Sequence, residues 1–146
     1  MSRRGSLALP LLLVLLAGCG GGPTVVPVTG TVRLKDRPLA HAVVNFIPVG
    51  ESEGQGGHGS TDAEGRYVLT GTRGENGIPP GEYKVTISLR LRPDGSLPEP
   101  NVPPIESDAT ERLLPQYWDR DLTRLQATVA KDAATHDFLV ELAPRP

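Results

Sequence analysis

The side chains that could carry chemistry in this chain are few and lie far apart in the sequence. Asp62 and Glu64 are two residues apart in a short polar stretch, and the three histidines are His41, His58 and His136. A calcium ion takes about six to eight converging oxygen ligands, and a structural zinc ion takes a tetrahedral set of ligands at characteristic short spacings. Neither pattern is present, so we predict a solvated turn at Asp62 and Glu64 and no metal site.

Tyr117 and Trp118 form the strongest candidate ligand-binding pair. An exposed aromatic ring could stack on a sugar ring, which would suit a glycan or a small hydrophobic ligand. In an extended segment the two rings would point to opposite faces, so at most one of them would be exposed. The competing interpretation is that one ring closes the end of the hydrophobic core, and the small number of aromatic residues (one Trp, three Tyr and two Phe) favours it.

The patterns of common catalytic sites are missing from the predicted elements. No nucleophile is expected in a Gly-x-Ser-x-Gly elbow, in which a serine lies at a sharp turn from a strand into a helix. No glycine-rich stretch follows a strand and opens a helix, as phosphate-binding loops do. We therefore expect a protein that is not an enzyme and that has no cofactor.

The elements that must position these side chains read as short strands. The 17 glycines and 15 prolines cluster between runs rich in Val, Leu and Ile, which is typical of turns in an all-β domain. A first strand is predicted over 25–34, and a second, with both faces largely apolar, over 39–49 in the interior of a sheet. Residues 50–59 contain no apolar side chain and are predicted to form an exposed loop. A tight turn ending at Gly65 then leads to a strand over 66–70.

Residues 82–92 carry the strongest strand pattern, with strict alternation that predicts a sheet with one solvated face. Residues 93–112 hold five prolines and are expected to run over the surface. The chain is predicted to re-enter the core over 113–118, and 122–130 with 135–142 to form a closing hairpin. The inward face of the strand over 82–92 is expected to consist of Tyr83, Val85, Ile87, Leu89 and Leu91.

The first residues have the pattern of an export signal. Arg3 and Arg4 precede an apolar run over 7–16, which is shorter than the roughly 20 residues of a transmembrane helix. The run ends in Leu16-Ala17-Gly18-Cys19, which resembles the lipobox of bacterial lipoproteins. This resemblance implies that Cys19 receives a diacylglycerol, that the signal is cut before it, and that the new amino group is acylated. The alternatives are an ordinary signal peptide cut elsewhere and an uncleaved anchor.

The cysteine count and the charge agree with an exported, anchored chain. Cys19 is the only cysteine, and structural cysteines of exported proteins normally come in pairs. Removing residues 1–18 takes Arg3 and Arg4 from the 15 basic residues and leaves all 17 acidic ones, so the remaining charge is near −4. A mildly acidic chain without a basic patch argues against nucleic acid as a partner.

Three stretches together resemble the carboxypeptidase regulatory-like domain. They are Gly30-Thr31-Val32 followed by residues 37–46, Thr61-Asp62-Ala63-Glu64-Gly65-Arg66-Tyr67, and Pro79-Pro80-Gly81-Glu82-Tyr83-Lys84-Val85. The resemblance covers residues 28 to about 91 and implies a transthyretin-like (prealbumin-like) β-sandwich. Arg37 stands where the family usually has glycine. The family implies no peptidase activity, because the domain accompanies catalytic domains and none is present in this sequence.

The sequence therefore predicts a signal peptide over 1–18, a flexible tether over 19–24, and one domain over 25–143. The domain is expected to be an all-β, prealbumin-like Greek-key sandwich of about seven strands. We expect export and lipid anchoring at the cell envelope, on the periplasmic or outer-membrane face or at the cell surface. The expected partners are membrane lipid, through acylated Cys19, and an envelope protein or glycan. The expected function is a non-catalytic binding or structural module, the alternative being a surface lipoprotein that binds a glycan or a small hydrophobic ligand.

Overall fold

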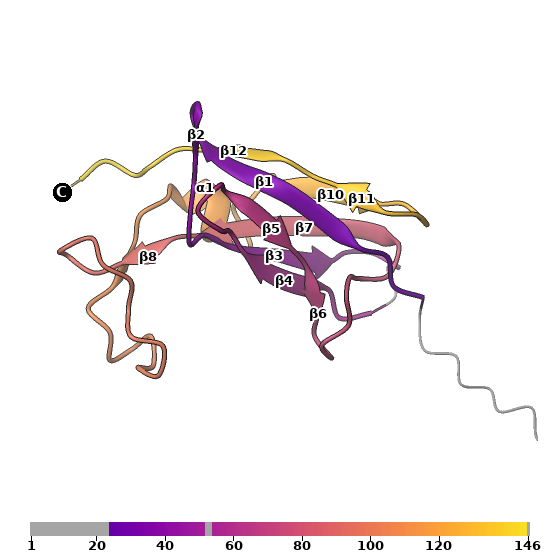
Figure 1. The fold of residues 1–146 in the computed structure, drawn as a ribbon, viewed down its shortest axis with the longest axis horizontal. Helices are drawn as coiled ribbons and strands as arrows, with labels where there is room; N and C mark the ends of the chain where they lie inside the picture. The colour runs from indigo at the N-terminus through magenta and orange to yellow at the C-terminus, as the bar shows by residue number, and fades with distance from the viewer. Residues whose placement is uncertain (1–23, 52–53, 146) are drawn as a thin grey trace, which may run out of the picture.

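The computed structural model describes residues 24–51 and 54–145, which form two β-sheets packed face to face (Figure 1). The prediction of an all-β sandwich is confirmed. The only helix in the described residues is one turn long. The elements are β1 (Val28–Leu34), β2 (Arg37–Pro38), β3 (Val43–Pro48), β4 (Gly57–Ser60), β5 (Arg66–Val68), β6 (Thr70–Gly71), β7 (Gly81–Ser88), β8 (Arg90–Leu91), β9 (Thr110–Glu111), α1 (Pro115–Trp118), β10 (Gln126–Val129), β11 (Ala134–Thr135) and β12 (Phe138–Val140).

One sheet, called the larger sheet below because its strands are longer on the whole, is antiparallel in the order β10-β7-β3-β4-β6. The second sheet, called the smaller sheet, is built around β1, which pairs with β2 and β5 in antiparallel fashion and with β11 and β12 in parallel fashion. The pair β8-β9 forms a small separate ribbon. Several strands are interrupted pieces of one run: β5 and β6 carry residues 66–71 from one sheet to the other, and this crossing closes one side of the sandwich.

The core lies between the sheets and follows the period-two pattern of the strands. Tyr83, Val85 and Ile87 of β7 are buried, as the alternation predicts, and Leu89 just beyond β7 is buried with them. Phe46 of β3 lies at the centre, with its ring centroid 6.4 Å from that of Tyr67 and 6.0 Å from that of Tyr83. Tilted aromatic contacts at these separations add to the stabilisation from burial. The predicted interior position of the second strand is confirmed, since β3 lies between β7 and β4.

The outer face of the larger sheet differs in part from the expectation. The second strand was predicted to be largely apolar on both faces, but Val43 of β3 is 38% exposed. On the predicted solvated face of β7, Thr86 is buried, and Asn45 of β3 donates a hydrogen bond to its Oγ1 at 3.4 Å. The strand prediction therefore assigned the inner face correctly and the outer face only approximately.

The prediction of an exposed loop over 50–59 is wrong for its last residues, because 57–60 form β4. A hydropathy pattern does not reveal this strand, because two of its four residues are glycines, Gly57 and Gly59. Their backbones pack closely against the backbone of residues 68–70. A Cβ at Gly57 would lie 2.7 Å from the carbonyl oxygen of Thr70, and one at Gly59 would lie 2.3 Å from that of Val68. Glycine is required here by the close approach of the backbones.

The predicted closing hairpin is also wrong. β10 pairs with β7 in the larger sheet, whereas β11 and β12 pair with β1 in the other sheet. Ala127, Val129 and Val140, which the alternation places on the inward faces, are buried, but Leu142, placed on the same face, is 45% exposed. Alternation fixes which face of a strand is buried but carries no information about its neighbour.

Tyr67 ties the two edges of the smaller sheet together. Its hydroxyl donates a hydrogen bond of 2.7 Å to the carbonyl oxygen of His136, across β1. Burial, and then the nearby charge of Asp137, raise the pKa of Tyr67 well above its usual range. The neutral phenol is therefore the form that the folded protein holds.

Replacing Tyr67 by phenylalanine should change the response of the protein to alkali. The pKa of Tyr67 is higher in the folded than in the unfolded chain, so its contribution is complete below about pH 10 and is lost as the pH rises further. Tyr67→Phe should lower the free energy of unfolding at pH 7 by about 1–3 kcal/mol, because the His136 carbonyl loses its donor. Urea denaturation between pH 7 and 11 should show a shallower alkaline loss in the variant. An unchanged slope above pH 10 would contradict this role.

Candidate functional site

The long connection between β8 and β9, residues 92–109, is a surface loop whose ends are fastened together. We call it the proline loop. Nη2 of Arg90 donates hydrogen bonds to the carbonyl oxygens of Ala109 (2.6 Å) and Pro104 (3.4 Å). The guanidinium of Arg92 pairs with the carboxylate of Asp108 at 3.0 Å, and Asp108 is the main reason that the pKa of Arg92 is raised. Loops of this length with closed ends often carry function.

Glu111 anchors the returning end of the proline loop to the sheet. Its carboxylate accepts hydrogen bonds from the Ser88 hydroxyl (2.5 Å) and from the backbone N–H groups of Leu89 (2.8 Å), Arg112 (3.1 Å) and Leu113 (3.2 Å). A carboxylate that accepts several hydrogen bonds at once holds its neighbours more firmly than a neutral acceptor does. The loop is thus positioned by side chains of β7, β8 and β9 and the residues beside them.

Removing this carboxylate should release the loop while leaving the sandwich folded. Glu111→Ala should lower the free energy of unfolding by about 1–3 kcal/mol, because the Ser88 hydroxyl and the N–H groups of Leu89 and Leu113 lose their acceptor. Limited proteolysis should then cut within 93–109 faster than in the parent protein. Glu106→Ala, on the exposed surface of the same loop, is the matched control. Equal cleavage rates in both variants would show that Glu111 does not hold the loop.

A groove of about 700 Å³ lies between the proline loop and the outer face of the larger sheet. Its volume is within the roughly 300–1,000 Å³ range of ligand-binding pockets. Val43 on the sheet side and Leu97 on the loop side are exposed apolar side chains, 38% and 45% respectively. The remaining lining residues are His41, Ser60, Ser88 and Arg90 on the sheet side and Pro98, Glu99, Pro100, Val102, Pro104 and Ser107 on the loop side.

His41 enters the groove from a backbone conformation that is unusual for its residue type. Its φ is +62°, in the left-handed region that non-glycine residues seldom adopt. Two hydrogen bonds to Thr61 hold it there. The His41 N–H donates to the Thr61 carbonyl oxygen (3.0 Å), and the Ala42 N–H donates to the Thr61 side-chain hydroxyl (2.9 Å). The chain before β3 is therefore fixed by the chain after β4, at the floor of the groove.

A second, smaller hollow of about 230 Å³ adjoins the groove and shares Glu99, Val102 and Ser107 with it. Its other lining residues are Arg92, Glu106 and Asp108. Since Arg92 is paired with Asp108, the exposed carboxylates of Glu99 and Glu106 give this hollow an acidic character.

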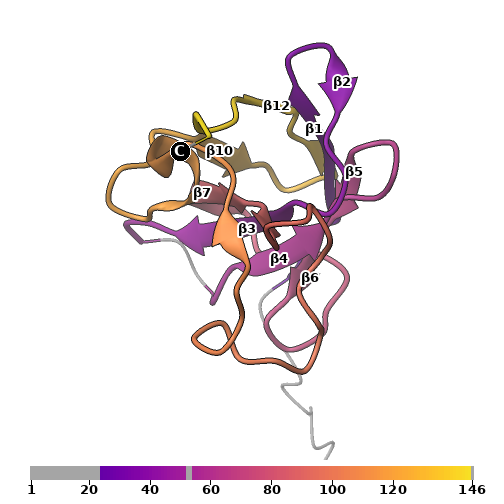
Figure 2. The same ribbon diagram turned by 90° about the vertical axis from the view of Figure 1, so that its left-hand side faces the viewer.

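The groove and the start of the described chain lie at opposite ends of the molecule. In Figure 1 the proline loop is at the left end of the long axis, whereas the chain enters β1 at the right end. Figure 2, seen from the left, has the loop in front of the two sheets. The connections from β3 to β4 and from β6 to β7 begin or end at the entry side instead.

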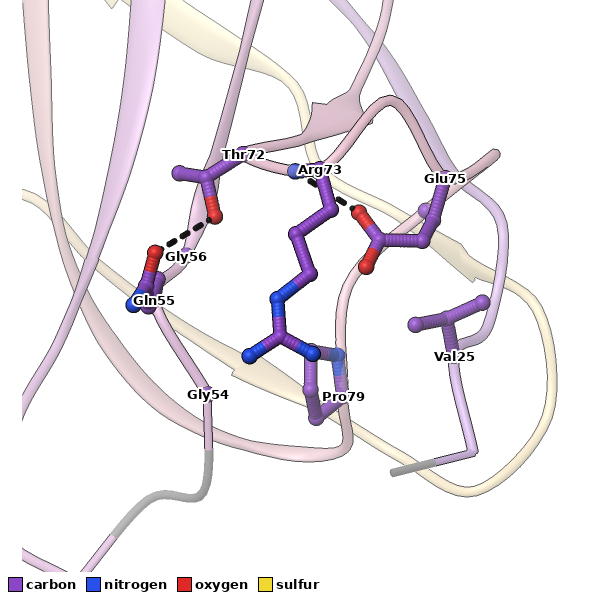
Figure 3. A pocket seen from close by; sticks show the side chains of 10 residues that line it. Val25, Gly54, Gln55, Gly56, Thr72, Arg73, Glu75 and Pro79 are labelled. Atoms are coloured by element: carbon purple, nitrogen blue, oxygen red, sulfur yellow. Dashed lines mark hydrogen bonds between the residues drawn. The ribbon is translucent and has the colours of Figure 1, made fainter. Parts of the chain in front are cut away.

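Figure 3 shows the pocket at that entry side, beside Val25. The Thr72 hydroxyl is 3.1 Å from Oε1 of Gln55, and the backbone N–H of Arg73 donates to the Glu75 carboxylate at 3.0 Å. The Arg73 side chain lies over Pro79 (Figure 3). The pocket encloses only about 40 Å³, far less than the roughly 300 Å³ of a small ligand site.

Tyr117 and Trp118 lie in α1 and have different surroundings. Tyr117 is buried in the core, in agreement with the interpretation that an aromatic ring closes one end of the sandwich. Trp118 is 39% exposed, and its indole N–H donates to the carbonyl oxygen of Leu113 at 3.2 Å. Neither lines the groove. Only Trp118 therefore keeps a surface on which a sugar ring could stack.

The polar turn at 62–65 has the predicted geometry. Gly65 has a φ of +74°, and the Asp62 carboxylate accepts hydrogen bonds from the N–H groups of Glu64 (3.0 Å) and Arg66 (2.9 Å). These hydrogen bonds, the one from Arg66 first, lower the pKa of Asp62. The Asp62 carboxylate thus stabilises the turn to which it belongs.

The metal-ligating residue types do not converge in the part of the chain that the structure describes. No group of three or more His, Cys, Asp or Glu side chains that could hold a metal ion is found over 24–51 and 54–145. His41 lies in the groove, His58 is on β4, and His136 precedes β12, with its Nε2 3.1 Å from the carbonyl oxygen of Thr128.

Residues 50–54 contain the spacing Gly-x-Ser-x-Gly, centred on Ser52, which sequence analysis did not single out. Ser52 itself lies outside the described residues. The stretch connects β3 to β4, so it joins two strands, whereas a nucleophile elbow joins a strand to a helix.

Cys19, the predicted lipidation site, also lies outside the described residues, as do residues 1–18. Over 24–51 and 54–145, the structure contains no helix that is long and apolar enough to cross a bilayer.

Comparison with known proteins yields one structural likeness. No family model matches the chain, and no curated protein matches it. Among solved structures, a DUF3823 family protein from Parabacteroides merdae is similar, with a TM-score of 0.41 and 13% sequence identity over 84% of this chain. The aligned part makes up 48% of that protein, so the present chain spans about half its length.

Proposed function

We propose that this protein is a lipid-anchored, non-catalytic binding module of the cell envelope, and that it binds its partner in the groove beneath the proline loop. The observation that carries the proposal is the position of the groove at the end of the sandwich opposite to the entry of the chain (Figure 1). A domain held by its N-terminus would present this groove away from the membrane.

The length of the tether supports this orientation. Five peptide units separate Cys19 from Thr24, and a fully extended chain spans about 3.3–3.6 Å per residue, so the entry side would stay within about 18 Å of the anchored cysteine. The loops at that side, near Gln55 and Arg73, would face the membrane. The proline loop would then be the most accessible long loop of the domain.

The sequence motifs of the carboxypeptidase regulatory-like domain are compatible with this role. Thr61 and Gly65, in its second stretch, build the turn and the hydrogen bonds beneath His41. Gly30, in its first stretch, lies beneath the Tyr67 hydroxyl. Each motif residue is used for packing or turn geometry, which suits a binding module whose specificity lies in its loops.

Replacing Cys19 by alanine tests the anchor. The parent protein should incorporate an alkyne-labelled palmitate and partition into the detergent phase, whereas Cys19→Ala should remain an unlabelled, uncut precursor because the acylated thiol is gone. Gly20→Ala, which keeps the cysteine, should behave as the parent does. A Cys19→Ala protein that still migrates as mature, lipid-modified protein would refute the anchor.

A glycan is the alternative ligand, and it rests on the exposed part of the Trp118 ring. Binding of the full chain to immobilised cell-wall glycan, lost in Trp118→Ala with an unchanged circular dichroism spectrum, would favour it. Retention that does not depend on Trp118 would count against it.

A further inference from the structure

The chemistry of the groove indicates what kind of molecule fits it. Val43 on β3 and Leu97 on the proline loop face the groove from opposite sides, and Val102 joins them. No Phe, Tyr or Trp side chain lines it, so a sugar would find none of the large aromatic rings on which sugars usually stack. An aliphatic side chain would remove these exposed apolar surfaces from water.

The loop wall of the groove is poor in hydrogen-bond donors. Pro98, Pro100 and Pro104 have no backbone N–H, and the N–H of Val102 already donates to the carbonyl oxygen of Glu99 at 3.2 Å. The carbonyl oxygens of Glu99 and Pro104 already accept a hydrogen bond, whereas those of Pro98 and Pro100 accept none from another residue that the structure describes. A partner with its own N–H donors, such as an extended peptide, complements this wall better than a carboxylate or phosphate does.

The proline loop carries a net negative charge, since Arg92 at its start is its only cation. Residues 93–109 contain four acidic residues, Asp94, Glu99, Glu106 and Asp108, and no lysine or arginine. Of the nearby cations, Arg92 is paired with Asp108, and Arg90 donates to two carbonyl oxygens. Asp94 accepts hydrogen bonds from Ser96. The carboxylates of Glu99 and Glu106 form no hydrogen bond or ion pair with any other residue that the structure describes, and the charge of Glu99 acts on Arg92 only as a minor cause of its raised pKa.

From these three features we infer that the groove binds an extended segment of an envelope protein in which apolar residues are flanked by lysine or arginine. The inference rests on the proposed function, because it names the partner of the same groove. The apolar groove would take an aliphatic side chain, and the adjoining hollow at Glu99 and Glu106 would take the basic one. The shared residues Glu99, Val102 and Ser107 place the two subsites side by side.

Binding of short peptides to the full chain tests this inference. The probe is a dye-labelled, end-blocked Lys-Val-Lys-Val-Lys-Val peptide, measured by fluorescence anisotropy against the protein in a maltoside detergent, with empty micelles as the blank. Glu-Val and Lys-Ser repeats of the same length are the comparison peptides. We expect the Lys-Val peptide to bind most tightly, the Lys-Ser peptide more weakly, and the Glu-Val peptide not at all.

Variants assign the binding to the groove. Glu99→Gln combined with Glu106→Gln should weaken binding of the Lys-Val peptide by about fivefold to tenfold, since exposed ion pairs contribute modestly. Leu97→Ser should weaken it by a similar factor through the apolar subsite. Glu51→Gln, the same chemical change at the entry side, is the matched control and should have no effect. Raising the salt from 0.15 to about 1 M should weaken binding by the parent but not by the doubly neutralised variant.

Several results would overturn the inference: no binding of the Lys-Val peptide, equal binding of the Glu-Val peptide, or unchanged affinity in the doubly neutralised variant. These outcomes are separate from the anchor, which the Cys19→Ala experiment decides. If the protein is lipidated but does not bind the Lys-Val peptide, the proposed anchor in the envelope stands and only the proposed class of partner is refuted.

Discussion

Replacing Gly30 by alanine should lower the free energy of unfolding by about 3 kcal/mol or more, or prevent folding. Gly30 lies in the middle of β1 on the inward face, between the buried Val28 and Val32. A Cβ there would lie 1.7 Å from the carbonyl oxygen of His136 and 2.7 Å from the Tyr67 hydroxyl. The new methyl group would therefore occupy the position of the hydrogen bond between Tyr67 and His136.

Chemical denaturation of both proteins measures this effect. Gly95→Ala is the control, because nothing lies within 4 Å of its Cβ position, and its positive φ of 85° should cost only about 1–2 kcal/mol. The amide signals of β5 and β12 should be the most disturbed in any folded fraction of Gly30→Ala. Equal stability losses at Gly30 and Gly95 would mean that the backbones do not approach as closely as described.

Replacing Val85 by aspartate should be similarly severe. Val85 is fully buried on β7, an interior strand of the larger sheet that pairs with β10 and β3, and its side chain faces the core. Its backbone N–H and carbonyl groups are already bonded to Leu125 and Thr123, so neither is free to solvate a carboxylate. A buried carboxylate without a partner should cost several kcal/mol.

Thermal unfolding followed by circular dichroism tests this prediction, with two further variants for comparison. Gln126→Asp, on the exposed face of the neighbouring β10, should melt close to the parent protein. Val85→Thr, which keeps the shape and adds one hydroxyl, should fall between the two. Unchanged melting of Val85→Asp would mean that the face of β7 assigned to the core is in fact exposed.

The groove could not have been predicted from the sequence, although the surface stretch and the strands that form it were. The stretch over 93–112 was expected to run over the surface, and that was all its prolines indicated. Its hydrogen bonds come from Arg90, which looks like an ordinary solvated charge of the alternating pattern, and from Glu111, which lies in the stretch expected at the surface. Only the folded chain shows that these two residues close the loop and bring Leu97 opposite Val43.

The sequence by itself determined the class of fold and the faces of the strands. The alternation through Tyr83, Val85 and Ile87, and the turn that needs Gly65, are local consequences of side-chain spacing and backbone conformation, so they can be read without knowing any neighbour. Tertiary structure decided which strands pair: it separated β10 from β12, and it made a strand of Gly57–Ser60. Pairing depends on contacts between residues far apart in the chain, and a period of two is satisfied equally well by any partner that covers the apolar face.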